Sequence, residues 1–93
     1  MKLRIINHQH YKVFLEPYED IYIIHCDVFV WNKHIKKSLL SDLDSFFLIH
    51  RSPVLAVHNG DEKHLKFLTM CKFKLYNTIE CTDGVVRQLF VRY

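Results

Sequence analysis

Glycine and proline are scarce in this chain, with two of each among 93 residues. No internal repeat, low-complexity stretch or linker-like segment interrupts the sequence. Its longest apolar runs span only a few residues, which excludes a transmembrane helix. The start, Met-Lys-Leu-Arg-Ile-Ile, lacks the apolar core of a signal peptide. We therefore expect one domain over residues 1–93, without a membrane span and not secreted by a signal peptide.

The cysteines are also few: Cys26, Cys71 and Cys81 are odd in number and form no C-x-x-C motif. This pattern is typical of free thiols in a reducing compartment and argues against a disulfide framework. The net charge of +3 permits an acidic partner but is smaller than most nucleic-acid-binding domains carry. The hydrophobic fraction of 49% supports one modest core.

The first third of the chain has the composition of β-strands. Residues 2–6 and 11–15 are short apolar segments that predict a hairpin, and residues 16–20 predict a turn. Residues 21–31 are rich in β-branched and aromatic side chains at odd and even positions alike. This predicts a central strand that is covered on both faces.

The apolar period then becomes helical, which predicts an N-cap at Asn32 and a helix over residues 33–50. The predicted buried positions of this helix are Ile35, Leu39, Leu43 and Phe46 or Phe47. Residues 53–57 predict a buried strand, and residues 59–61 predict a turn before a second helix that ends near Lys72. Residues 75–81 and 85–91 predict a hairpin. The order β-β-β-α-β-α-β-β predicts an α/β (α+β) domain with a mixed, mostly antiparallel sheet.

Over residues 20–93 this order of elements resembles the C-terminal core of the GNAT acetyltransferase superfamily. Residues 61–73 are similar to the family pattern Asn-x-x-Ala-Ile-Arg-Phe-Tyr-Glu-Lys-Leu-Gly-Phe, with matches at Asp61, Leu65, Lys66, Phe67 and Phe73. The resemblance implies a single truncated GNAT-like domain. It also implies that the start of the first long helix corresponds to the family's binding site for the pyrophosphate of coenzyme A.

The chain departs from the family where chemistry is expected. The family's anion loop resembles Arg-Gly-x-Gly-Ile-Gly, and Asn32, His34 and Lys36 occupy its glycine positions here. Backbone N–H groups must approach the pyrophosphate closely, and side chains at these positions obstruct that approach. The tyrosine that in many members protonates the leaving thiolate aligns with Leu68, which donates no proton. The glycine before the final phenylalanine of the pattern aligns with Lys72.

These departures predict no catalytic residue and no bound cofactor. If the chain is instead a reduced acetyltransferase, acetyl-coenzyme A would lie against the start of the first helix, at Asn32, Lys33, His34, Ile35, Lys36 and Lys37.

A narrower resemblance is to the GNAT-like internal virion proteins of short-tailed coliphages. It is carried by His64-Leu65-Lys66-Phe67-Leu68 in the second helix and by Glu80-Cys81-Thr82-Asp83-Gly84 at the hairpin. This resemblance implies a small bacteriophage protein that is packaged in the particle or made in the host cytoplasm.

Lysines offer a possible anion site. Lys33, Lys36 and Lys37 fall in the first turn of the long helix, where cations oppose the helix dipole at a cost of a few tenths of a kcal/mol each. They form either a solvated face or, if the two helices adjoin, a basic patch together with Lys63, Lys66, Lys72 and Lys74. Binding through such a patch would fall with salt.

Other reactive side chains favour structural roles. His8, His10 and His25 do not have the convergent spacing that a metal site requires, so we expect no metal. Cys71 lies on the apolar side of the second helix, which predicts a buried thiol rather than a nucleophile. Asp42 and Asp44 are predicted to be solvated residues on one helix face.

Aromatic residues exceed what so small a core needs, which predicts that some are exposed. The candidates for exposed partner contacts are Trp31, Tyr18 and Tyr93, with Lys33, Lys36 and Lys37. Three hypotheses follow: a non-catalytic GNAT-like phage protein that binds a phage structural or host protein, a minimal acetyl-coenzyme A-dependent N-acetyltransferase, and a small nucleic-acid-binding module. The first is favoured because packing positions are kept while the anion loop and the acid are missing.

Overall fold

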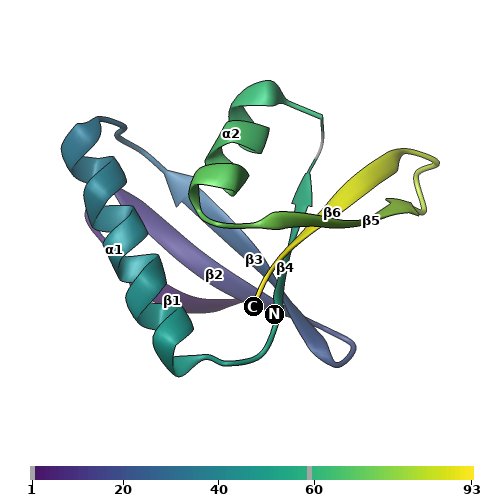
Figure 1. The fold of residues 1–93 in the computed structure, drawn as a ribbon, viewed down its shortest axis with the longest axis horizontal. Helices are drawn as coiled ribbons and strands as arrows, with labels where there is room; N and C mark the ends of the chain where they lie inside the picture. Colours follow the sequence, from purple (N-terminus) through teal and green to yellow (C-terminus); the bar gives the residue numbers. More distant parts are fainter. Residues whose placement is uncertain (1, 59) are drawn as a thin grey trace.

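A computed structural model describes residues 2–58 and 60–93, and Asn59 of the predicted turn lies outside them. Within these residues six strands form one mixed sheet in the order β1-β2-β3-β4-β6-β5, with two helices (Figure 1). The elements are β1 (Leu3–Asn7), β2 (Tyr11–Tyr18), β3 (Ile21–Val28), α1 (Lys33–Ile49), β4 (Val54–His58), α2 (Glu62–Met70), β5 (Lys74–Glu80) and β6 (Val86–Arg92). The predicted element order and the α+β class with a mixed sheet are confirmed.

The sheet is antiparallel except between β3 and β4, which α1 connects as a parallel crossover. α1 begins where the sequence predicts, because the side chain of Asn32 caps it. In the described part of the chain neither helix is long and apolar enough to cross a membrane.

Side chains of both helices pack into one core on a single face of the sheet. Residues of α1 at helical spacing meet alternate residues of β2, β3 and β4, and the core includes Tyr11, Val13, Leu15, Ile35, Leu39, Leu43, Phe47, Val54, Ala56, Leu68 and Phe90. Of the two phenylalanines predicted for the end of α1, Phe47 is the buried one and Phe46 packs beside it. A fully buried leucine such as Leu39 contributes roughly 1.5–3 kcal/mol of burial free energy.

The predicted turn over residues 16–20 is present but shorter, since β2 continues to Tyr18 and only Glu19 and Asp20 turn. Pro17 is tolerated because β1 pairs with β2 only as far as Leu15, so that β2 is an edge strand beyond this point. Glu19 takes a left-handed conformation, with φ of 53°, to close the turn.

The predicted strand over residues 21–31 is too long, because β3 ends at Val28. Val28 pairs with Tyr11, the first residue of β2, so no strand partner exists beyond it. Phe29 and Trp31 are consequently 61% and 49% exposed. The prediction that this strand is covered on both faces is also wrong: none of its residues is fully buried, and those that pack against the core, Tyr22, Ile24 and Cys26, lie on one face only.

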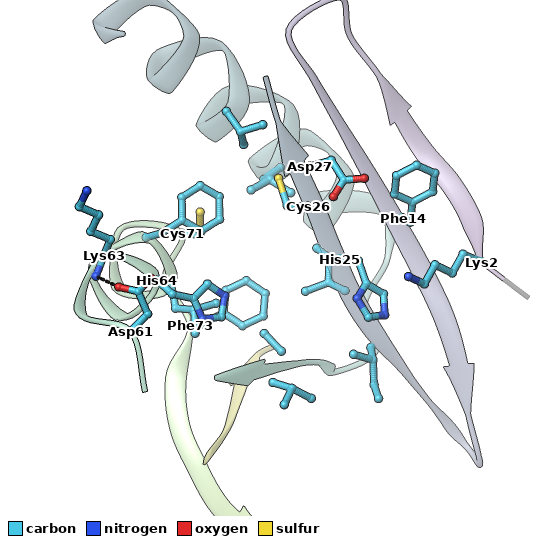
Figure 2. Close-up of a pocket in the computed structure, with 18 residues that line it drawn as sticks. Lys2, Phe14, His25, Cys26, Asp27, Asp61, Lys63, His64, Cys71 and Phe73 are labelled. Carbon is cyan, nitrogen blue, oxygen red and sulfur yellow. Dashed lines mark hydrogen bonds between the residues drawn. The ribbon is translucent and has the colours of Figure 1, made fainter. Parts of the chain in front are cut away.

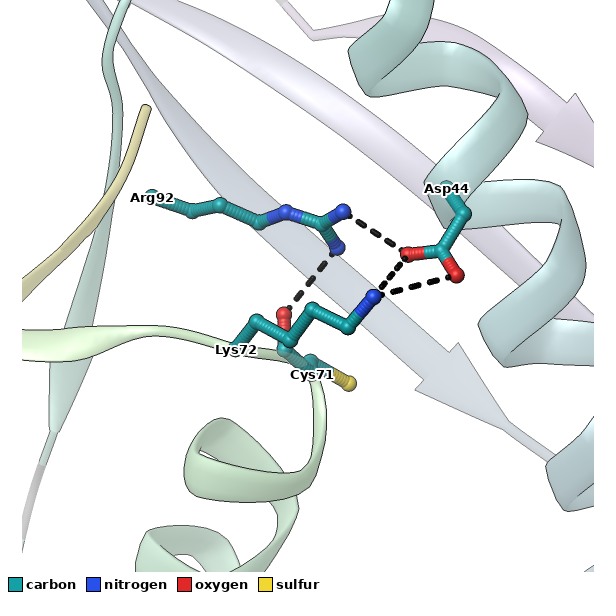
Figure 3. A network of polar contacts seen from close by, with 4 residues as sticks. All are labelled: Asp44, Cys71, Lys72 and Arg92. Carbon is teal, nitrogen blue, oxygen red and sulfur yellow. Dashed lines mark hydrogen bonds and ion pairs between the residues drawn. The ribbon is translucent and has the colours of Figure 1, made fainter.

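Asp42 and Asp44 are not merely solvated, as the sequence predicted; each ties α1 to the sheet. The Tyr11 hydroxyl donates a hydrogen bond to Asp42, and burial together with that bond raises the pKa of Tyr11 to about 12. Figure 3 shows the second contact, in which Arg92 donates to Asp44 at 2.7 Å and to the Cys71 carbonyl at 3.1 Å. Arg92 thereby links β6, α1 and the end of α2.

The C-terminus of α2 explains why the family pattern has a glycine where this chain has Lys72. The Phe73 N–H donates to the Leu68 carbonyl and the Lys72 N–H donates to the Thr69 carbonyl, which is the hydrogen-bond pattern of a Schellman motif. This motif requires a left-handed residue, and Lys72 has φ of 68°. Position 72 therefore requires a left-handed backbone conformation, which glycine adopts most easily. Lys72 in addition forms an ion pair with Asp44 at 3.3 Å.

Substitution of Lys72 separates the backbone strain from the ion pair. Lys72→Ala and Lys72→Gly both remove the exposed ion pair, but only glycine relieves the left-handed strain. We expect Lys72→Gly to be more stable than Lys72→Ala by about 1 kcal/mol in urea unfolding. Equal stability of the two variants would contradict the assignment of the turn.

Candidate functional site

The site begins where β3 and β4 separate. These parallel strands are paired only at Tyr22 with Val54 and at Ile23 with Leu55. Beyond these pairs β3 stays with β2 while β4 stays with β6, so an opening forms between the strands. α2 follows β4 directly and lies beside this opening (Figure 1).

A cavity of about 870 Å³ occupies the opening. Figure 2 shows β3 side chains such as His25 and Asp27 on one side and α2 side chains such as Lys63 and His64 on the other. Ala56 and Val57 of β4 also line it. The volume lies within the range of small-molecule sites.

Two cysteine thiols line this cavity, and neither is activated. Burial raises the pKa of Cys26 to about 12 and that of Cys71 to about 11. A thiol needs a lowered pKa to act as a nucleophile at neutral pH. The interpretation of Cys71 as a buried structural thiol is confirmed by its 1% exposure.

Two histidines of the cavity have side-chain hydrogen bonds: His25 with Glu16, and His64 with another histidine. Nδ1 of His64 lies 3.0 Å from Nδ1 of His58, which is buried at the end of β4. One ring must donate and the other accept, so this contact requires a neutral ring. Burial, followed by the nearby His58, lowers the pKa of His64, while Asp61 acts in the opposite direction.

Leu68 stands where the resemblance places the acid of the family, and it is a core residue. It is 3% exposed, lines the cavity and belongs to the main core cluster. Leu65, which the family pattern counts as a match, is instead 38% exposed. At the position that the resemblance assigns to the acid, α2 therefore presents a leucine to the opening. The leucine of α2 that packs in the core is Leu68, and Leu65 is not part of the core.

The start of α1 is the expected pyrophosphate position, and three of its backbone N–H groups already donate hydrogen bonds. Asn32 Oδ1 accepts hydrogen bonds from the N–H groups of His34 and Ile35, both at 3.0 Å. The Asn32 carbonyl accepts from the Lys36 N–H at 2.9 Å. An anion at this helix end would have to displace the Asn32 cap, which is typically worth about 1 kcal/mol.

A second, smaller hollow of about 480 Å³ adjoins the cavity, and we call it the lysine groove. It is lined by Val28, Trp31, Lys36, Lys63, Lys66, Phe67 and Met70. Residues 63, 66, 67 and 70 fall on one face of α2 because helical neighbours recur every three or four positions. Trp31 packs towards Phe67, with ring centroids 6.0 Å apart.

The lysine groove brings together part of the predicted basic patch. Lys36 of α1 lines this groove together with Lys63 and Lys66 of α2, so one hollow brings these three lysines together. Lys72 instead pairs with Asp44, and Lys33, Lys37 and Lys74 do not line the groove.

The predicted exposed aromatics are exposed but do not share one surface. Tyr18 lies beside the start of β3, where it pairs with Ile21. Tyr93 follows Arg92, which pairs with Val54 at the start of β4. Trp31 follows the other end of β3. Their exposures are 55% for Tyr18, 75% for Tyr93 and 49% for Trp31.

Sequence reasoning missed His64 and Asp27 as cavity residues. His64 precedes Leu68 by four positions, so helical spacing offered a signal that both face the opening. Asp27 had no local signal, because only the loss of pairing between β3 and β4 exposes it to the cavity. The described residues contain no group of three or more metal-ligating side chains, and His8 instead accepts a hydrogen bond from the His10 N–H.

The burial of His64, together with its contact to His58, predicts a pH dependence of stability. Because the pKa of His64 is lower in the folded state, the unfolded chain binds more protons than the folded chain once pH falls below the unfolded pKa of His64, about 6.5. The contribution of His64 is therefore present above pH of about 6.5 and is lost as pH falls below it. We expect urea unfolding between pH of about 7 and 5 to show this loss in the wild type and a smaller loss in His64→Gln.

The exposed His34 provides the control for this experiment. His34→Gln removes a histidine whose side chain is exposed, so it should retain the wild-type pH dependence. If His64→Gln followed the wild-type curve instead, the contact would not control stability in this pH range.

Comparison with known proteins gives one informative match. No protein-family model matches the chain, and no curated protein matches it. Among solved structures, a Bordetella pertussis protein assigned to the GNAT family of acetyltransferases is similar, with a TM-score of 0.67 and 12% sequence identity. The similarity covers 90% of this chain and 57% of that protein, so the chain spans little more than half of its length. This likeness shows the fold: the chain is an α+β domain with a GNAT-like fold.

Proposed function

We propose that this chain is a non-catalytic GNAT-like domain that acts by binding another protein. The observation that carries the proposal is the occupied start of α1. Asn32 Oδ1 accepts hydrogen bonds from the N–H groups of His34 and Ile35. The resemblance places these groups where the family binds pyrophosphate through its backbone. With side chains in place of the glycines of the loop, a pyrophosphate has neither the donors nor the close approach that it needs.

The cavity also lacks a suitable proton donor at the expected position. Leu68 occupies the place of the family's tyrosine, and the two cavity thiols have raised pKa values. A thiolate leaving group in this cavity would meet apolar surface at the position where the family supplies a proton. Loss of the acid and loss of the anion loop support the same conclusion independently.

An exposed apolar surface supports protein binding. Val28, Phe29, Val30 and Trp31 are 36%, 61%, 41% and 49% exposed, and they are consecutive in the chain. Exposed apolar surface of this kind, next to lysines, is typical of an interface with a partner.

The resemblance to internal virion proteins of short-tailed coliphages suggests where such a partner occurs. We propose that the chain is a bacteriophage component of the particle or an inhibitor of a host factor in the host cytoplasm. Mass spectrometry of purified particles separates these settings, because a particle component would be present in fixed proportion to the other particle proteins.

A reduced N-acetyltransferase is the second candidate, and one observation favours it. The cavity between β3 and β4 adjoins the lysine groove, and the two share Val28, Lys63 and Phe67. An elongated ligand could extend through both, with His64 as a neutral base beside it and lysines near its phosphates. In that case lysine side chains would replace the missing backbone donors of the loop.

Calorimetric titration with acetyl-coenzyme A distinguishes the two candidates. We expect no binding in the micromolar range, because the cap at Asn32 and the absent glycines leave the pyrophosphate without donors. Asn32→Gly frees both N–H groups at a cost of only a few tenths of a kcal/mol in helix stability, so it should bind more tightly than the wild type. Micromolar binding by the wild-type chain would overturn the non-catalytic proposal.

Protein binding through the exposed run is tested by paired substitutions. Trp31→Ala and Tyr18→Ala each remove an exposed aromatic side chain, but the two lie at opposite ends of β3. In affinity capture from infected cells, a stoichiometric partner should be lost with Trp31→Ala and kept with Tyr18→Ala. Absence of any stoichiometric partner, or equal retention by both variants, would count against this surface.

A further inference from the structure

We infer that the lysine groove binds an acidic peptide segment of the partner, with an apolar side chain packed against Trp31 and the exposed face of α2. The inference rests on the proposed protein-binding function and names the chemistry of the partner. Its basis is the combination of apolar lining with three lysines that form no ion pair among the described residues, in one hollow of about 480 Å³.

The floor of the groove is apolar and adaptable. Val28, Trp31, Phe67 and Met70 supply four of its lining residues, and the Trp31 and Phe67 rings are tilted at 60° to each other. An aromatic pair beside a flexible methionine accommodates an inserted leucine, methionine or phenylalanine side chain. The exposed Phe29 and Val30 extend the apolar surface beyond the groove. A central apolar anchor is therefore the contact expected to supply most of the binding energy.

The charge of the groove is positive and has no partner within the described residues. Lys36, Lys63 and Lys66 are exposed, and none of them forms an ion pair there. Ion pairs among the described residues lie elsewhere: His25–Glu16, Lys72–Asp44, Arg92–Asp44 and Arg87–Asp83.

The N-terminal end of α1 adds to this positive potential, because Lys36 lies in its first turn and the start of a helix is itself partly positive. Lys63 lies in the first turn of α2, where Asp61 and Glu62 offset the positive helix end, although neither carboxylate lines the groove. Carboxylates of a partner would meet three ammonium groups around the apolar floor, which is the complementarity that favours an acidic peptide.

A nucleic acid fits these features less well. Nucleic-acid interfaces bury on the order of 1,000 Å² or more of protein surface and rely on arginine as well as lysine. Here Arg87 and Arg92 are held by Asp83 and Asp44, away from the groove. The net charge is only +3, and the apolar floor suits one inserted side chain rather than a row of stacked bases.

Trp31 provides a direct readout because it is the only tryptophan in the chain and lines the groove. The probe is a short synthetic peptide of glutamates around one central leucine, which itself contains no tryptophan or tyrosine. We expect saturable change of the Trp31 fluorescence, with an affinity that falls as salt is raised. The same peptide with glutamines in place of the glutamates should bind at least about tenfold more weakly.

Charge reversal locates the site without disturbing the core, since the lysines concerned are exposed. Lys36→Glu combined with Lys63→Glu should weaken peptide binding by at least about tenfold. Lys37→Glu combined with Lys74→Glu makes the same change in net charge outside the groove and should weaken it far less. Equal weakening by the two pairs would overturn the assignment of the groove.

Two further results would overturn the inference. The first is equal binding of the glutamine peptide, and the second is tighter binding of a single-stranded RNA oligonucleotide than of the acidic peptide at the same salt concentration.

Failure of this inference differs from failure of the proposed function. If the peptide does not bind but Trp31→Ala still abolishes partner capture, the partner is a protein of other chemistry. Micromolar binding of acetyl-coenzyme A would instead overturn the proposed function itself.

Discussion

The structure depends on the separation of two parallel strands. β3 and β4 share only two residue pairs, after which each follows a different antiparallel neighbour. Strands that part no longer cover each other, so side chains of β3, β4 and α2 line a cavity between them. Buried side chains from both helices, Leu43 and Leu68, line the opening from the core side. The cavity, the position of α2 and the lysine groove all follow from this divergence.

Around that opening, the positions to which the GNAT resemblance assigns chemistry make structural contacts here. Asn32 closes the start of α1 with its own side chain, where the resemblance implies a bound pyrophosphate. Leu68 belongs to the core, where the resemblance implies an acid. Lys72 keeps the left-handed turn that a glycine would otherwise supply, and adds an ion pair to Asp44. The fold is thus maintained by local solutions that differ from those a coenzyme-binding site would require.

Local patterns in the sequence predicted the elements well, because caps and periods are local. Asn32 as N-cap and the buried spacing of Ile35, Leu39 and Leu43 need no knowledge of the rest of the chain. The end of β3 could not be predicted in this way, since it is set by Tyr11 at the start of a different strand.

The site was predictable only in part, because contacts between distant parts of the chain leave no local pattern in the sequence. The lysines could be named from their positions on two helices, but only the packing of the helices separates Lys36, Lys63 and Lys66 from Lys72. The cavity itself arises from pairing between distant strands, and no local pattern marks it. Likewise, Trp31 and Tyr18 are both exposed, but sheet register alone places them at opposite ends of β3.

The central proposal is that the start of α1 does not bind a pyrophosphate, and backbone amide NMR tests this at the atoms concerned. Spectra of the labelled chain would be recorded during titration with acetyl-coenzyme A up to millimolar concentration. The account predicts that the amide signals of His34 and Ile35 keep their positions, because Asn32 Oδ1 holds both N–H groups. Saturable shifts of these two signals at micromolar concentration, together with shifts of cavity residues such as His64, would contradict it.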